Sequence, residues 1–136
     1  MAAGYSGKPL IEKLGIKESM ILHFINLPSK DFIKDWGTLP KQIQILDKPK
    51  SGLDMIHFFT LSSKEYFQKL PKLIKFIKPT GMIWISWPKK SAKIPSDMNE
   101  DLIRNFALEL GLVDIKVCAV DEIWSGLKLV IRKENR

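Results

Sequence analysis

Two short segments contain the side chains whose chemistry best suits a bound ligand. The first, Ser86-Trp87-Pro88-Lys89-Lys90, follows an apolar run and places an indole beside two ammonium groups. Such a combination suits a phosphate, a carboxylate or a nucleotide. If the apolar run is a strand of an open α/β sheet, the segment lies at a strand end, where such sheets bind ligands. We therefore predict a ligand site at Trp87, Lys89 and Lys90; the alternative is that Trp87 caps the core and both lysines coat a loop.

The second segment, Asp121-Glu122-Ile123-Trp124-Ser125-Gly126, concentrates two acids and an indole in a short connection. Two adjacent acids could transfer a proton or hold a hard metal ion. They could equally flank a turn and pair with lysines, an arrangement that stabilises little at the surface. We add Asp121, Glu122 and Trp124 to the predicted ligand site, and we predict no catalytic residue and no metal.

Histidine and cysteine offer little further chemistry. His23 and His57 each lie inside an apolar run, and no cluster of His, Cys and Asp has the spacing of a metal site. We therefore predict two core histidines whose rings are hydrogen-bonded. Cys118 is the only cysteine, so no internal disulfide can form, and its apolar neighbours predict a buried thiol.

The charge of the chain is unevenly distributed. The 136 residues have a formal net charge of +7, and residues 1–93 carry 16 basic and 7 acidic residues. A basic face could attract phosphate, nucleic acid or an acidic partner. Nucleic-acid binding is the weaker alternative, because the lysines of residues 64–78 cover one arc of a predicted helix while Tyr66 and Phe67 belong to its apolar face, so aromatic side chains do not alternate with the lysines as single-strand binding requires.

The sequence also bears on where the protein works. No apolar run approaches the ~18 residues of a membrane span, and residues 1–8 lack the pattern of a secretion signal. We expect one cytoplasmic domain spanning residues 1–136, without a membrane partner.

Strand-like apolar runs alternate with amphipathic, helix-like segments along the chain. Predicted strands cover residues 20–25, 43–46, 54–61, 82–87, 115–120 and 127–131, and predicted helices cover 9–14, 29–36, 62–77 and 96–110. The predicted caps are Ser29, the Ser62/Glu65 capping box, and Ser96 or Asp97.

The connections between these elements decide the architecture. Pro71 predicts a kink or a break in the third helix. The connection at residues 121–126 is too short for a helical crossover, so we expect the last two strands to be antiparallel. The sequence therefore predicts a three-layer α/β fold with about six strands, a mostly parallel sheet and an antiparallel C-terminal edge.

Three segments of this layout, at residues 53–56, 79–85 and 111–114, carry a resemblance to a known fold. They resemble the starts of the fourth and fifth strands and the closing hairpin of S-adenosylmethionine-dependent methyltransferases. The resemblance implies their Rossmann-like sheet, with one βα unit missing.

The turn after the first strand departs from that resemblance. Methyltransferases need a glycine-rich turn there so that backbone amides approach the cofactor closely. This chain has Asn26-Leu27-Pro28-Ser29, and Pro28 lacks an amide hydrogen. Asp47 follows the second strand, where an acid could hold a ribose. We interpret Asn26, Pro28 and Asp47 as the edge of a vestigial cofactor site and expect no cofactor; an atypical enzyme that binds S-adenosylmethionine is the alternative.

Nearly the whole chain is also similar to a family of short bacterial proteins classed as a domain of unknown function. The similarity rests on residues 5–10, 13–15, 86–90, 124–128 and 132–136, and above all on residues 111–122. It implies a shared fold and transfers no activity. We therefore predict a small, non-catalytic module that binds a small anionic ligand or a protein partner at the carboxyl edge of its sheet.

Overall fold

The structure, a computed structural model, describes residues 8–136, and residues 5–7, which contribute to the family similarity, lie outside this range. A six-stranded sheet in the order β2-β1-β3-β4-β6-β5 runs through its centre. The strands are β1 Ile21–Ile25, β2 Gln44–Leu46, β3 Leu53–Phe59, β4 Ile77–Pro88, β5 Leu112–Ala119 and β6 Trp124–Ile131. Strands β1 to β4 pair in parallel, whereas β6 is antiparallel to both β4 and β5. The predicted mostly parallel sheet with an antiparallel C-terminal edge is confirmed.

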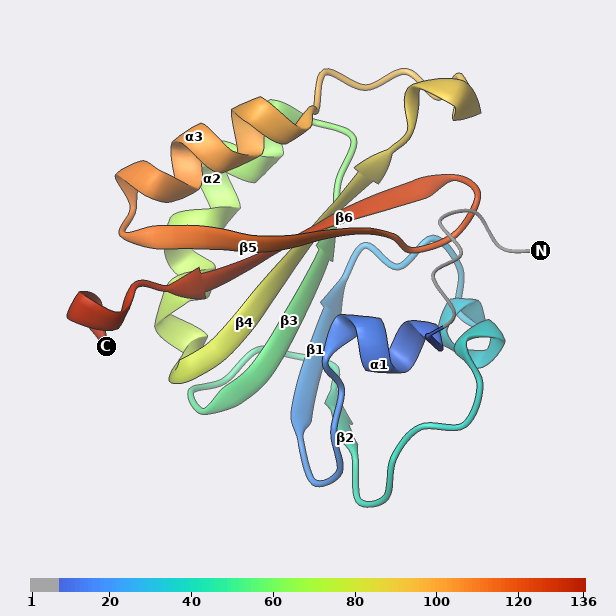
Figure 1. The fold of residues 1–136 in the computed structure, drawn as a ribbon, viewed down its shortest axis with the longest axis vertical. Helices are drawn as coiled ribbons and strands as arrows, with labels where there is room; N and C mark the ends of the chain where they lie inside the picture. Colours follow the sequence, from blue (N-terminus) through green and yellow to red (C-terminus); the bar gives the residue numbers. More distant parts are fainter. Residues whose placement is uncertain (1–7) are drawn as a thin grey trace.

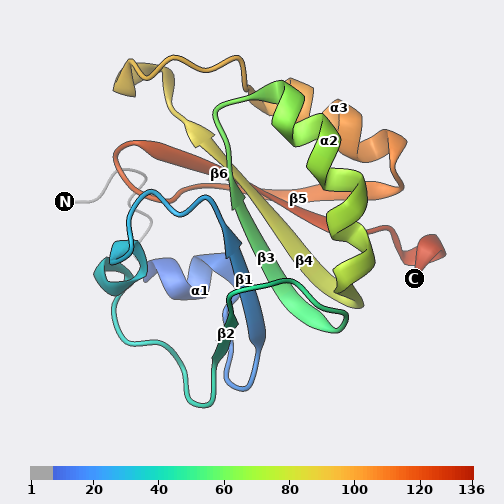
Figure 2. The same cartoon turned by 180° about the vertical axis from the view of Figure 1, so that it is seen from behind.

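Helices cover both faces of the sheet. The α-helices are α1 Leu10–Leu14, α2 Ser63–Leu73 and α3 Glu100–Glu109, and 3₁₀ helices cover Phe32–Trp36, Ile74–Phe76, Lys90–Ala92 and Lys133–Asn135. Figures 1 and 2 show α2 and α3 side by side on one face and α1 on the other. No helix within residues 8–136 has the length and apolar character needed to cross a membrane.

Each face of the sheet has its own hydrophobic core. On the α2/α3 face, Tyr66 and Ile103 pack against strand residues such as Ile83, and the Tyr66 hydroxyl donates to the carbonyl of Ile103 at 2.7 Å. On the α1 face, Leu14 and Trp84 are completely buried. Because both faces are covered, the central strands have no solvated face, which explains their almost continuously apolar sequences.

The cap predicted for α3 is wrong. Asn99 caps this helix, its Oδ1 accepting from the amide of Leu102 at 2.8 Å. The two predicted caps make tertiary contacts instead: Ser96 Oγ donates to the carbonyl of Leu61, and Asp97 accepts from the amide and the hydroxyl of Ser63. Asp97 therefore caps α2 from a distant part of the chain.

Two other local predictions also need correction. The segment after Ser29 is a 3₁₀ helix without a side-chain cap, not a capped α-helix. The predicted break at Pro71 does not occur, because α2 continues through it to Leu73. Pro71 lies in the last turn of α2, so its missing amide removes only one late helical hydrogen bond.

Candidate functional site

A pocket opens at the carboxyl ends of β1 and β3. From β1 the chain continues to β2 on one side and then to β3 on the other side. The crevice between β1 and β3 is therefore the topological switch point, where open α/β sheets bind ligands. The cavity has a volume of about 360 Å³. Its lining comes from the turns after β1 and β3, the first turn of α2 and the start of β6: Asn26, Pro28, Phe59, Thr60, Leu61, Ser62, Glu65 and Trp124.

Glu65 provides the charge at this pocket. Its carboxylate accepts from Thr60 Oγ1 at 2.6 Å, from Lys69 Nζ at 2.9 Å and from Asn26 Nδ2 at 3.1 Å. Burial alone would raise the pKa of Glu65, but the hydrogen bonds from these three donors outweigh it, and the pKa lies below its ordinary value. Glu65 is therefore ionised at neutral pH.

The predicted capping box forms only in part. Ser62 Oγ accepts from the amide of Glu65 at 3.2 Å, as predicted, but the amide of Ser62 donates to Thr60 Oγ1 instead of to Glu65. The Glu65 carboxylate is thus turned away from the helix end and toward the pocket.

Asn26 closes the crevice between β1 and β3. Its backbone has φ 59°, a left-handed conformation that Asn tolerates better than most residues. Its side-chain amide donates to the carbonyl of Phe59 at 3.0 Å as well as to Glu65. The turn after β1 therefore adopts a positive φ without glycine, and its side chain ties the two strand ends together.

Aromatic rings line the apolar part of the pocket. The rings of Phe59 and Trp124 meet edge to face, with centroids 5.3 Å apart. Trp124 is half-buried at the start of β6. Of the six residues in the predicted ligand site, Trp124 is the one that lines this pocket.

The structure does not gather all six predicted ligand-site residues in one pocket. Trp87 is only 8% exposed and packs in the α2/α3 core, as the alternative interpretation had it. Trp124 packs against the core of the opposite face. Lys90 lies in the 3₁₀ helix Lys90–Ala92, beside a different hollow that is lined by Asp97 and Glu100.

Lys89, directly after β4, contacts the β5–β6 turn that contains Asp121. Lys89 Nζ donates to the carbonyl of Asp121 at 2.8 Å, and Asp121 Oδ1 accepts from the amides of Ile123 and Trp124. Glu122 is exposed in the same turn. These contacts fix the shape of the turn and leave Asp121 Oδ1 with two backbone donors.

The three residues of the predicted vestigial cofactor edge are also separated. Asn26 and Pro28 line the pocket at the end of β1. Asp47 is exposed, one residue beyond the end of β2, and is not among the lining residues. Within residues 8–136, no group of three or more His, Cys, Asp or Glu residues is placed to hold a metal ion.

Both histidines are buried in the sheet. His23 is 5% exposed, with Nδ1 2.8 Å from the carbonyl of Leu46, so the prediction of a hydrogen-bonded core histidine is confirmed for it. His57 is fully buried, and its Nε2 lies 2.6 Å from Ser86 Oγ. Its Nδ1 has no hydrogen-bond partner within residues 8–136. The prediction of a hydrogen-bonded core histidine is therefore confirmed for Nε2 of His57 but not for Nδ1.

Sequence reasoning missed Glu65, Thr60 and Phe59 as pocket residues. Glu65 had been assigned to a helix cap, and Thr60 and Phe59 to a buried strand. The available signal was the position of Thr60 and Glu65 directly after a strand and in the first turn of the following helix, where ligand-binding side chains gather.

Comparison with known proteins supports the fold. No protein-family model matches the sequence, and no curated protein matches it. Among solved structures, a SAM-dependent methyltransferase from Aquifex aeolicus is similar with a TM-score of 0.62 and 14% identity, covering 90% of this chain and 88% of that one. Magnesium protoporphyrin IX methyltransferase from Synechocystis PCC 6803, solved with bound SAM, has a TM-score of 0.58 and 10% identity, covering 90% and 74%.

These similarities show that the chain has the Rossmann-like fold of SAM-dependent methyltransferases, as the three sequence segments indicated. At such low identities they carry no activity with them, because one fold serves many functions.

Proposed function

We propose that this chain is a binding module on a methyltransferase-like fold, and that its ligand is a small molecule with a cationic group on an apolar body. The ligand binds at the carboxyl ends of β1 and β3. The observation that carries the proposal is the ionised Glu65, held by three donors at an apolar cavity beside Phe59 and Trp124.

The pocket selects by charge and by shape. The carboxylate of Glu65 attracts a cation, and aromatic faces such as that of Trp124 add to the attraction. The cavity of about 360 Å³ falls within the range of small-molecule sites. Lys69 pairs with Glu65 at 2.9 Å and offsets part of its charge, but the lining itself contains no cationic side chain within residues 8–136, so the anionic ligand expected from Lys89 and Lys90 suits this pocket less well than a cation does.

Hydrogen bonding favours a binding role over an acid–base role. Thr60, Asn26 and Glu65 already bond to one another, so the network is ordered before a ligand arrives. A general base works best with a pKa near the operating pH, whereas Glu65 has a pKa below its ordinary value. Glu65 is therefore suited to holding a positive charge and not to exchanging protons.

Three probes with one aromatic body test this selectivity: phenethylamine, phenethyl alcohol and phenylacetate. In an NMR titration we expect the amine to shift the Thr60 amide and the Trp124 indole most, and phenylacetate least. The Glu65→Gln variant should weaken amine binding by roughly tenfold, because one charged hydrogen-bond acceptor is lost. Binding of the alcohol should change by less than about twofold.

Glu109→Gln is the matched control, because Glu109 is an exposed acid at the end of α3. It should leave all three titrations unchanged. Equal binding of phenylacetate and phenethylamine by the unmodified protein would contradict the proposal, and so would a preference for the amine that survives in Glu65→Gln.

A second candidate is an atypical transferase that binds S-adenosylmethionine, as the fold's enzymes do. The left-handed backbone of Asn26 favours it, because it gives the turn a positive φ without glycine. The sulfonium of S-adenosylmethionine would also suit Glu65. The turn fits the amino-acid part of this cofactor poorly, since Pro28 lacks a backbone donor and the side-chain amide of Asn26 already donates to the Phe59 carbonyl and to Glu65.

Calorimetry with S-adenosylmethionine and S-adenosylhomocysteine separates the two candidates. The transferase should bind both, with dissociation constants of roughly micromolar order. The binding module should bind S-adenosylhomocysteine more weakly than S-adenosylmethionine, because both carry an ammonium group but only S-adenosylmethionine has a positive charge on sulfur. Micromolar binding of both, with NMR shifts at Asn26 and Leu27, would establish the second candidate in place of the first.

A further inference from the structure

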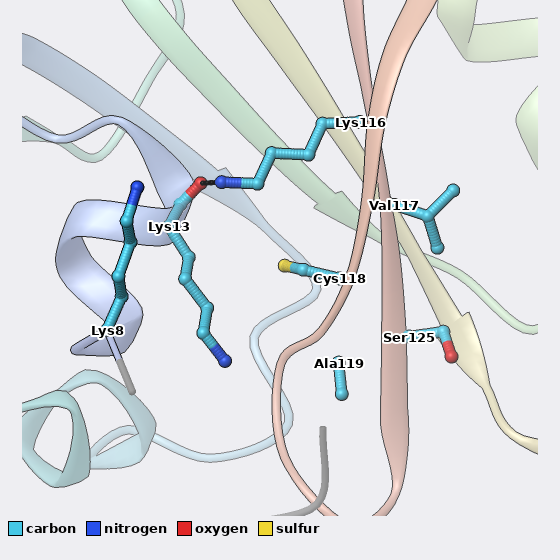
Figure 3. Close-up of a pocket in the computed structure, with 7 residues that line it drawn as sticks. All are labelled: Lys8, Lys13, Lys116, Val117, Cys118, Ala119 and Ser125. Carbon is cyan, nitrogen blue, oxygen red and sulfur yellow. Dashed lines mark hydrogen bonds between the residues drawn. The ribbon is translucent and has the colours of Figure 1, made fainter. Parts of the chain in front are cut away.

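A larger cavity lies on the α1 face, between α1 and the edge strand β5. Its volume is about 540 Å³, and its lining residues are Lys8, Lys13, Lys116, Val117, Cys118, Ala119 and Ser125. Figure 3 shows the side chains of Lys13 and Cys118 pointing into the space between α1 and β5. Lys116 reaches across it from β5, and its Nζ donates to the carbonyl of Lys13 at 3.0 Å. None of these residues lines the pocket of the proposed function.

Two lysines lie opposite each other in the β5–β6 hairpin, directly beside a change of register in β5. Asp114 is paired with Leu129, but Lys116, two positions later, is paired with Lys128, the next residue back along β6. Ile115 is therefore the extra residue of a bulge. Like charges directly opposite in an antiparallel pair are destabilising, and bulges are a common means of re-aiming a side chain at a functional site.

The charges of these lysines are not neutralised by nearby acids. Within residues 8–136, none of the salt bridges involves Lys17, Lys116 or Lys128. Burial lowers the pKa of Lys128, and the positive charges of Lys116 and Lys17 lower it further. The ammonium groups of Lys116 and Lys17 thus repel that of Lys128.

The positive charges of the lysines also act on Cys118 in the cavity. Burial raises the pKa of the Cys118 thiol, while the positive charges of Lys116 and Lys13 act in the opposite direction. Lys116 uses one of its three N–H donors on the Lys13 carbonyl, so two donors remain for another acceptor. The cavity therefore combines positive potential, available donors and room for a ligand.

We propose that this cavity binds a small phosphorylated compound, with Lys116 of its lining holding the phosphate and Lys128, the cross-strand partner of Lys116, adding positive charge from beside the lining. A dianion offsets the repulsion between the paired lysines better than a monoanion can. Lysine binds phosphate as a point charge, and a volume of about 540 Å³ also accommodates an organic part. An uncompensated pair of like charges lowers the folding stability of the protein without ligand. Local losses of stability of this kind are expected at functional sites.

Cys118 allows a direct test, because it is the only cysteine of the chain and lines the cavity. Inorganic pyrophosphate should slow alkylation of Cys118 by iodoacetamide in a saturable manner. Potassium chloride at the same ionic strength should not. The Lys116→Gln/Lys128→Gln double variant should need at least about tenfold more pyrophosphate for half-protection, because two charged contacts are lost.

Lys72→Gln is the matched control, since Lys72 is exposed on α2 at the other face of the sheet. It should leave the protection unchanged. Glu65→Gln should also leave it unchanged, so this proposal and the proposed function can fail separately.

A second variant distinguishes binding from a structural role. Lys116→Glu replaces the like-charge pair with an opposite-charge pair, so it should raise Tm by about 2 °C while it abolishes protection by pyrophosphate. If the lysine pair only stabilised the fold, Lys116→Glu would lower Tm instead of raising it.

Three results would overturn the proposal. One is equal protection by pyrophosphate in the double variant and the unmodified protein. Another is protection by potassium chloride alone. The third is a single-stranded oligonucleotide that protects Cys118 at lower concentration than pyrophosphate, which would assign the cavity to nucleic acid.

Discussion

Lowering the pH from 6.5 to 5 is expected to reduce the free energy of unfolding by roughly 2 kcal/mol through His57 alone. His57 is completely buried, and burial lowers its pKa from 6.5 to about 3. Its ring stacks on Phe59 with centroids 4.3 Å apart, and Trp36 and Trp84 lie around it. In these surroundings a charged imidazolium would lose its hydration without gaining a counter-ion.

The sign of the effect follows from which state takes up the proton. Below pH 6.5 the unfolded chain protonates His57, while the folded chain does not until about pH 3. Unfolding therefore becomes more favourable by about 1.4 kcal/mol per pH unit between these limits, and the effect vanishes above pH 6.5. Glu65 and Asp97 also have lowered pKa values, but their contribution is lost only at more acidic pH, where carboxylates protonate.

Urea unfolding at pH 7, 6 and 5 measures this slope. His57→Gln should show a flat profile between pH 6.5 and 5, whatever its stability at pH 7. His23→Gln is the matched control, because it leaves His57 in place and should keep the slope. A steep slope that persists in His57→Gln would show that another group takes up the proton.

The architecture was predictable because it depends on patterns that run through whole segments. Continuous apolar runs such as the one at Met82, Ile83 and Trp84 require a sheet covered on both faces. The short connection at residues 121–126 leaves no room for a crossover helix. These constraints still hold when the predicted ends of strands and helices are wrong by a few residues.

Helix caps could not be predicted equally well, because they depend on what each side chain meets in three dimensions. Asp97 has the right chemistry for a cap and is close to the start of α3. It caps α2 instead, because the fold places Ser63 within hydrogen-bonding distance. The same competition turns the Glu65 carboxylate from the helix end toward Asn26 and Thr60.

The two indoles of the predicted ligand site are separated for a reason of register. In the antiparallel pairing of β4 and β6, Trp87 is opposite Ser125 and Pro88 is opposite Trp124. Side chains alternate between the faces of a sheet, so this offset of one residue puts the two indoles on opposite faces. The residue types alone do not determine the register between β4 and β6. The sequence therefore predicted Trp87 and Trp124 in the same site.

The lysine cavity was missed because Lys116 and Lys128 are far from each other in the chain. A signal existed: Lys128 lies between Leu127 and Leu129 within an apolar run. A charged side chain in an apolar run is either paired with a neighbouring group or has a functional role. Only the register of the β5–β6 hairpin, in which Ala119 is opposite Ser125, reveals that the neighbour of Lys128 across the strand is a second lysine.

Replacing Trp84 with phenylalanine is expected to lower the free energy of unfolding by about 3 kcal/mol. Trp84 is completely buried on the α1 face, and its indole N–H donates to the carbonyl of Leu14 at 2.9 Å. Phenylalanine leaves a void and an unpaired buried carbonyl. Trp36→Phe is the matched control, because Trp36 is 8% exposed and no hydrogen bond of its indole appears in the structure; its loss should be smaller by roughly 1–2 kcal/mol.

The same variant also tests how the lysine cavity is built. The Leu14 carbonyl that Trp84 holds is adjacent to Lys13, whose own carbonyl receives Lys116. Loosening the end of α1 should therefore weaken the protection of Cys118 by pyrophosphate in Trp84→Phe, measured at a temperature where the variant is folded. Binding of phenethylamine should persist, since α1 contributes no residue to that pocket. If protection instead remained at its original strength while stability fell by the expected amount, the position of α1 would not depend on the indole, and Lys116 and Lys128 would hold the anion without it.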